Sequence, residues 1–235
     1  MRRANGFYGD VMDNRHFSND DQQLLEQVML HRRDVRGNNF LRDEVPDDVI
    51  NKILHSASLA PSVGYSQPWE FVVIRDAAVK TKIAASFEIE NRKAEDCFVD
   101  DKKNMYTQLK LEGIHEAPVN IAVFYKPEKE PVLGQNTMPE TGEYSVVCAV
   151  QNMWLMSRAL NVGMGWVSIL DPQAVKQILN SPPGNKLVAY LCIGYVGEFF
   201  STPELERLQW KARKPLEAAI HRETYADGEN LDYES

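Results

Sequence analysis

The pattern of hydrophobic and polar positions along the chain predicts several helices. Leucine, valine and methionine recur at helical spacing up to residue 31, after helix-capping and acidic residues at 18–21. A second helix is predicted to start near residue 46 and to end before Pro61, with its apolar positions on one face. The stretch 77–112 is charged and only patchily amphipathic, which indicates one or two exposed helices.

Short apolar runs rich in β-branched and aromatic residues predict strands. They lie at 69–75, 118–125, 166–169 and 187–196. The segment 143–160 is apolar on nearly all sides, which is typical of a helix buried all round, in a domain core or at a subunit interface. Gly163 or Gly165 is predicted to end that helix.

The order of these elements, with strands separated by helices, predicts an α/β or α+β fold. The chain lacks a strand-first βαβ opening, and no G-x-G-x-x-G follows a predicted strand, so a Rossmann site is not expected. No linker divides the chain. We therefore predict one domain over residues 18–224, after an N-terminal arm at 1–17 and before a disordered acidic tail at 225–235.

Composition narrows the class of protein. The 235 residues are 43% hydrophobic and 26% charged, as in globular proteins, and the net charge of −8 disfavours nucleic acid and anionic membranes as partners. No run approaches the roughly 20 apolar residues of a membrane helix. Three dispersed cysteines and five histidines without ligand spacing predict free thiols and no metal site. We therefore expect a cytoplasmic protein.

Two cationic clusters stand out in this acidic chain. Arg32, Arg33 and Arg36 place three forked guanidinium groups within five residues, a pattern suited to a phosphate. The alternative is that these cations complement the C-terminal end of a helix, at about 0.3–1 kcal/mol each. The second cluster includes Lys211 and Arg213, and its alternative is a solvated surface. Convergence of both clusters on one dianion is the sharper hypothesis.

Two further motifs join predicted elements. The segment 60–69 combines two prolines, a glycine and small hydroxyl residues, so it predicts a rigid loop that a flat ligand can approach, or a tight turn between helix and strand. The segment 163–169 is either a helix stop leading into a strand or a source of backbone N–H groups and the Ser168 hydroxyl for a ligand. The residues alone leave both alternatives open.

Taken in order, R-R-x-x-R, P-S-x-x-x-x-Q-P-W, G-x-G-W and K-x-R-x-P-L resemble the FMN-dependent nitroreductase superfamily. Within it, the chain is similar to the 5,6-dimethylbenzimidazole synthase (BluB) family. The resemblance covers about Leu24 to Leu216. Asp34 stands where typical nitroreductases carry Ser or Thr, Tyr65 where they usually carry Asn, and Ser168 where they often carry Pro.

The resemblance implies a nitroreductase-like α+β fold with α/β-type layers, in which helices flank a central mixed sheet. It also implies a domain-exchanged homodimer with FMN in the subunit interface. It implies that Arg32, Arg36 and Arg213, supported by Lys211, hold the FMN phosphate. Asp34 and Ser168 become the candidate catalytic residues, as base or proton relay. The residues implied to contact FMN are Arg32, Arg33, Asp34, Val35, Arg36, Ser62, Val63, Gly64, Leu109, Ser168, Lys211 and Arg213. Ser62, Val63 and Gly64 would reach it from the partner subunit.

The reaction that the resemblance implies is the O2-dependent fragmentation of reduced FMN to 5,6-dimethylbenzimidazole, the lower ligand of vitamin B12, with release of erythrose 4-phosphate. Reduced FMN would then be a substrate, supplied by a separate NAD(P)H flavin reductase. Two alternatives stay open. One is an NAD(P)H-dependent nitro- or quinone reductase in which FMN stays intact. The other is a non-catalytic flavin-binding protein.

Overall fold

The computed structural model describes residues 15–225, which fall into two compact units. The first unit ends at Phe199 and the second begins at Phe200. The predicted domain, residues 18–224, spans both units. Most of the two predicted arms, at 1–14 and 226–235, lies outside the described residues.

A four-stranded sheet forms the centre of the first unit. Its order is β1-β2-β4-β3, so β1 and β3 are the edge strands. The bounds are Trp69–Ile74 for β1, Val119–Tyr125 for β2, Gly163–Val167 for β3 and Lys186–Gly194 for β4. The α+β class and the predicted strands are confirmed, with β3 beginning earlier than predicted.

The sheet differs from the predicted mixed one in the direction of its strands. Within residues 15–225, all ladders between the named strands are antiparallel. Parallel pairing is confined to an isolated bridge between Asp34 and Met164, next to which Val35 N donates to the Met164 carbonyl at 3.1 Å. Apolar runs identify buried strands but not their neighbours, and the neighbours decide direction. The bridge brings the first cationic motif to the outer edge of β3.

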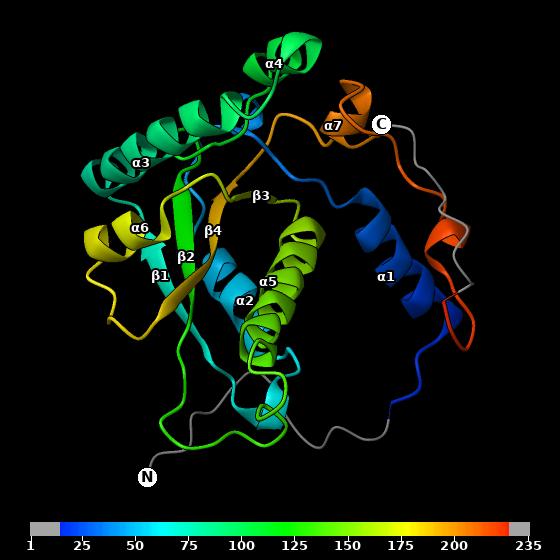
Figure 1. The fold of residues 1–235 in the computed structure, drawn as a ribbon. Helices are drawn as coiled ribbons and strands as arrows, with labels where there is room; N and C mark the ends of the chain where they lie inside the picture. The colour runs from blue at the N-terminus through cyan, green and yellow to red at the C-terminus, as the bar shows by residue number, and fades with distance from the viewer. Residues whose placement is uncertain (1–14, 226–235) are drawn as a thin grey trace. The chain divides into compact units, whose positions relative to one another are not determined.

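Helices cover both faces of the sheet (Figure 1). α2 (Asp47–Ser58) and α5 (Thr141–Ala159) pack on one face and enclose one hydrophobic core. α3 (Ala77–Glu95) and α6 (Pro172–Ile178) pack on the other face around a second core. α4 (Asp100–Thr107) follows α3, so the charged stretch after residue 77 does form two helices.

The first helix, α1 (Asn19–His31), begins where its sequence predicts. The Ser18 hydroxyl accepts a hydrogen bond from Asp21 N, and the Asp21 carboxylate accepts one from Ser18 N, which makes a capping box. The helix contains no buried residue, although it carries several apolar side chains. Its apolar residues are therefore open to a partner.

The prediction that the 143–160 helix is buried all round is wrong for the single chain. One face of α5 is buried, with Val146, Val150 and Met153 against the sheet and α2. Tyr144 is 54% exposed and Val147 40% exposed on another face. A helix that lies on one face of a sheet contacts neighbours on one side only, so the remaining apolar residues stay open.

The glycines after α5 do not end it. The helix ends at Ala159, and Gly163 and Gly165 are the first and third residues of β3. The predicted helix stop at these glycines is therefore wrong. Because glycine is disfavoured inside strands, its presence there indicates a close backbone approach rather than a turn.

Three short helical turns and a small helix complete the described chain. η1 (Gly37–Asn39) and η2 (Val63–Tyr65) belong to the first unit. α7 (Glu204–Arg207) and η3 (Leu216–Ala219) belong to the second. Within residues 15–225, no helix is long and apolar enough to cross a membrane.

Candidate functional site

The edge of β3 is shaped by Gly165. A Cβ added there would lie 2.0 Å from the Val35 carbonyl oxygen, so only glycine lets the two backbones approach this closely. Val35 itself is buried, which anchors the segment after α1 in the core. The glycine in G-x-G-W therefore serves the contact between two motifs that lie far apart in the sequence.

A closed ring of polar contacts joins the side chains of Asp34 and Arg36 to the backbone N–H and carbonyl of Trp166. The Trp166 N–H donates to Asp34 Oδ1 at 3.0 Å, and the Trp166 carbonyl accepts from Arg36 Nη1 at 3.2 Å. Arg36 Nη2 forms an ion pair with Asp34 Oδ2. The side chains of Arg36 and Asp34 are 16% and 33% exposed, so the ring is partly buried and only partly accessible to solvent.

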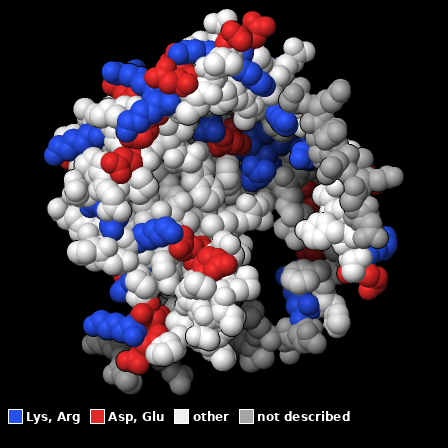
Figure 2. Space-filling view, in the orientation of Figure 1, with Lys and Arg blue, Asp and Glu red and all other residues white. Residues whose placement is uncertain are grey.

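The segment after α4 packs against the same ring. Arg36 Nη1 also donates to the Leu111 carbonyl at 3.1 Å, and Gly37 N donates to the Glu112 carbonyl at 2.8 Å. Lys110 pairs with the carboxylates of Glu112 and Glu116. Figure 2 shows basic and acidic side chains mixed in a hollow in the upper middle of the face it draws.

The three arginines of the first motif have different partners. Arg33 Nη1 donates to the Leu30 and Arg32 carbonyls at 2.7 and 2.6 Å, so it caps the end of α1. Arg36 is bound in the ring. Arg32 lies over the Trp154 ring, 4.8 Å from its centroid, and makes no hydrogen bond within residues 15–225. Arg32 is the cation of this motif with unused donors.

Trp154 of α5 binds both backbone segments of the site, a role that its place in an apolar helix did not suggest. Its indole N–H donates to the carbonyls of Arg33 and Met164, at 3.2 and 3.1 Å. Its ring also lies 6.3 Å from that of Trp166, centroid to centroid. A buried tryptophan needs an acceptor for its N–H, and that requirement is the sequence signal that could have marked it.

The other predicted residues of this region adjoin the ring in sequence. Ser168 is exposed directly after β3, two residues beyond Trp166, and its carbonyl accepts from Leu170 N at 3.0 Å. Leu109 is half-buried, two residues before Leu111. The structure therefore gathers the 32–36 motif, Leu109 and Ser168 on segments that contact Arg36 or Asp34.

The predicted loop at 62–64 lies at the other end of α5. Val63 N donates to the Ser145 hydroxyl at 3.0 Å, and the Ser62 hydroxyl accepts from Gln67 N at 3.0 Å. Gly64 has a φ of 55°, a conformation that favours glycine. These contacts fix the loop to α5, and Figure 1 shows η2 near the start of that helix and β3 near its end.

The second cationic cluster belongs to the second unit. Lys211 and Arg213 are exposed there, between α7 and η3. Convergence of this cluster with the 32–36 motif stays a prediction.

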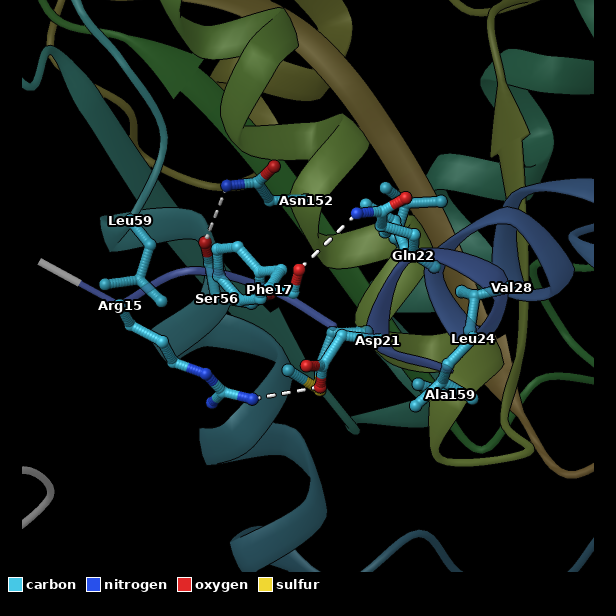
Figure 3. Close-up of a pocket in the computed structure, with 13 residues that line it drawn as sticks. Arg15, Phe17, Asp21, Gln22, Leu24, Val28, Ser56, Leu59, Asn152 and Ala159 are labelled. Carbon is cyan, nitrogen blue, oxygen red and sulfur yellow. Dashed lines mark hydrogen bonds and ion pairs between the residues drawn. The ribbon is translucent and has the colours of Figure 1, made fainter. Parts of the chain in front are cut away.

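An apolar groove of about 540 Å³ lies between α1, α2 and α5. Figure 3 shows Leu24 and Val28 of α1 facing it, with Leu59 from the end of α2. Three polar contacts join its lining residues. Asn152 donates to the Ser56 carbonyl at 3.1 Å, Gln22 donates to the Phe17 carbonyl at 3.4 Å, and Arg15 pairs with Asp21 at 2.9 Å (Figure 3). None of the residues predicted to contact FMN lines this groove. It continues the exposed apolar surface of α1 and α5.

Comparison with known proteins identifies the family. The family model described as the nitroreductase family matches residues 29–195. The 5,6-dimethylbenzimidazole synthase of Rhodospirillum rubrum is 45% identical over 81% of this chain and 90% of its own length. The synthase of the same name from Rhodobacter capsulatus is 37% identical over 86% of this chain and 97% of its own length.

A solved structure supports the same fold. Iodotyrosine deiodinase bound to FMN and 3-iodo-L-tyrosine superposes with a TM-score of 0.64 at 22% identity, covering 75% of this chain and 91% of that one. The chain therefore belongs to the nitroreductase family and, within it, to the family of the 5,6-dimethylbenzimidazole synthases. The predicted nitroreductase-like α+β fold, and the prediction that the chain is an enzyme of the oxidoreductase class, are confirmed.

Proposed function

We propose that this chain is a 5,6-dimethylbenzimidazole synthase that fragments reduced FMN with O2 and releases erythrose 4-phosphate. The observation that carries the proposal is the Asp34 carboxylate fixed at the edge of β3, on the peptide two residues before Ser168. Asp34 and Ser168 occupy positions where ordinary nitroreductases usually carry other residues. The 45% identity to a synthase supports the same reaction.

The residues present fit a bound FMN. Arg32 has unused donors within the described chain, and its guanidinium is held on Trp154, so it is suited to the phosphate. Arg213 and Lys211 are proposed to support it. Arg33, Val35, Arg36 and Leu109 complete the proposed binding segments in this chain. When bound, reduced FMN supplies the ring system that is broken down.

The proposed chemistry of this chain's own residues is proton transfer and enclosure. The Asp34 carboxylate accepts from the Trp166 N–H and pairs with Arg36, and an ionised carboxylate is a proton acceptor. Ser168 is exposed two residues after Trp166, whose N–H binds Asp34, and offers a hydroxyl that can donate or accept. A closed site is needed so that O2 chemistry leads to product and not to peroxide.

We also propose a homodimer in which Ser62, Val63 and Gly64 reach the flavin of the partner subunit. Ser145, which binds Val63, and Trp154, which holds the 32–36 motif, lie roughly 14 Å apart along α5, since a helix rises about 1.5 Å per residue. The two binding segments therefore contact opposite ends of one helix. Exposed apolar side chains on α1 and α5 support a partner that covers them.

The remaining parts of the proposal concern supply and location. Reduced FMN would come from a separate NAD(P)H flavin reductase, because the sequence offers no dinucleotide motif after a strand. Cys97, Cys148 and Cys192 are all free thiols, which supports a reducing compartment, and we propose the cytoplasm.

The test is a single-turnover experiment. The protein is loaded anaerobically with reduced FMN and exposed to air, and the products are analysed by mass spectrometry. Formation of dimethylbenzimidazole and erythrose 4-phosphate is expected, with loss of flavin. Intact FMN with continued NADH oxidation would instead favour the reductase alternative. Tightly held FMN without turnover would favour the non-catalytic one.

A further inference from the structure

We propose that Arg36 is a positioning residue that fixes the Asp34 carboxylate to the end of β3 and thereby sets Asp34 relative to Ser168. The inference depends on the proposed function only for the reaction in which Asp34 takes part. It assigns Arg36 a role other than the phosphate contact that the family resemblance implies.

The ring that Arg36 closes leaves little freedom. The Asp34 carboxylate binds the Trp166 N–H with one oxygen and Arg36 with the other, while Arg36 binds the carbonyl of the same Trp166 residue. A guanidinium is planar and presents its donors in a fixed fork, so it holds both partners in one geometry. The contact to the Leu111 carbonyl ties the ring to the segment after α4 as well.

The same contacts argue against Arg36 as the main phosphate ligand. Its Nη1 and Nη2 atoms have three acceptors from the protein, and its side chain is 16% exposed. Turning it to a phosphate would leave two carbonyls and a partly buried carboxylate without these donors, which is unfavourable. Arg32 has no such contacts to lose within residues 15–225.

Several other charged groups face the pair and stay unchanged in the test below. Arg32 and Arg33 lie on the same segment. The segment after α4 contributes Lys110, which pairs with both Glu112 and Glu116. On β4, burial raises the pKa of the Cys192 thiol well above its ordinary value, so this group stays neutral.

The first measurement is the yield of dimethylbenzimidazole per flavin oxidised, at saturating reduced FMN and across pH. Arg36→Gln removes the charge, and Arg36→Lys keeps it but loses the fork. Arg75 is the matched control, because it also binds a carbonyl, that of Val45, and a carboxylate, that of Asp47. Arg75→Gln is expected to leave the yield at the wild-type level.

Arg36→Gln is expected to lower the yield roughly 10- to 100-fold, the loss of one charged hydrogen bond. Its yield should also need a higher pH, because the positive charge that pairs with the Asp34 carboxylate is gone. Arg36→Lys keeps the positive charge, so the pH dependence of its yield should match that of the wild type, and part of the yield should return. A loss of affinity for FMN that riboflavin does not share, with a normal yield at saturation, would overturn the proposal.

A double variant tests whether the two residues act as a unit. Asp34→Asn combined with Arg36→Gln should yield no less product than Asp34→Asn alone, because the single change already removes the Asp34–Arg36 ion pair. Losses that multiply would mean that Arg36 acts elsewhere, and the proposal would be wrong.

The last measurement separates this inference from the proposed function. In the flavin-free protein, hydrogen exchange of the Trp166 amide should accelerate roughly tenfold in Arg36→Gln and stay unchanged in Arg75→Gln. Unchanged exchange in Arg36→Gln would overturn the inference whatever the activity. Accelerated exchange in a protein whose wild type forms no dimethylbenzimidazole would support the ring and reject the synthase function.

Discussion

The three arginines between residues 32 and 36 have different roles because their side chains contact different partners. Arg33 satisfies carbonyls at the end of α1, and Arg36 holds a carboxylate and two carbonyls. Arg32 rests on an aromatic ring with its donors unused in the described chain. The same residue type therefore serves as a helix cap and as a structural clamp within five positions, and we propose Arg32 as an anion ligand.

Arg32 is expected to bind the FMN phosphate. Arg32→Gln should weaken FMN roughly 10- to 100-fold, since a hydrogen bond to a charged group contributes about 1.5–3 kcal/mol, and should affect riboflavin little. Titration of flavin fluorescence measures both. Arg92→Gln makes the same charge change at an exposed position of α3 and serves as the control. Equal weakening of both flavins by Arg32→Gln would reject the phosphate assignment.

Asp34 separates the two enzymatic alternatives. Asp34→Asn keeps the shape and can still accept from the Trp166 N–H, but it removes the proton acceptor. We expect reduced FMN to bind and react with O2, and the yield of dimethylbenzimidazole to fall at least about 100-fold, the usual size of general-base catalysis. The flavin should return as FMN with peroxide. A wild-type yield at saturating reduced FMN would show that Asp34 only braces its arginines.

At the scale of elements, the site depends on the outer edge of β3. An edge strand has unpaired backbone groups, and here the segment after α1 supplies their partners through the Asp34–Met164 bridge and the ring at Trp166. Gly165 makes that approach possible. The segment that pairs with the edge of β3 therefore also carries the residues of the site.

Gly165→Ala is expected to destabilise the fold and to disturb the site. Its Cβ would lie 2.0 Å from a backbone oxygen, which cannot rotate away, so the free energy of unfolding should fall by about 1–3 kcal/mol. Gly184→Ala is the matched control, because its Cβ would have its nearest neighbour at 4.0 Å. Urea denaturation of both variants measures the difference. Equal stability of the two would show that the approach is looser than described.

At the scale of the whole molecule, the chain leaves apolar surface uncovered. α1 has no buried residue, and Leu24, Leu25 and Leu30 are each more than half exposed. The outward face of α5 adds Tyr144 and Val147. A short helix gains most of its stability from packing its apolar face, so these surfaces are suited to a second copy of the chain.

Val147→Glu is expected to release monomers that no longer hold FMN, because it places a charge in the proposed interface. Sedimentation measures the assembly. Ile89→Glu makes the same kind of change at an exposed position of α3 and should leave the dimer intact. Thiol labelling gives a second measurement. Cys148, exposed in the single chain, should react readily only in Val147→Glu, whereas Cys97 should react in both proteins. A monomeric wild type that binds FMN would contradict the dimer.

The sequence by itself determined the local elements. Capping residues, apolar spacing and β-branched runs predicted α1, α2 and the strands, because each depends on interactions between near neighbours in the chain. The motifs of the site and their family were also readable, since the residue types that bind a flavin phosphate carry their chemistry with them. The detail of the 32–36 motif was not readable in this way.

Only the tertiary structure decided what depends on contacts between distant segments. It made the sheet antiparallel between its strands, placed Gly165 inside β3, and gave α5 one buried face and one open face. It also gave three similar arginines different partners. Arg33 binds a carbonyl of α1, whereas Arg36 binds the carbonyls of Leu111 and Trp166. The periodicity of a sequence records which residues are apolar, but a hydrogen-bond partner about 130 positions away leaves no local trace.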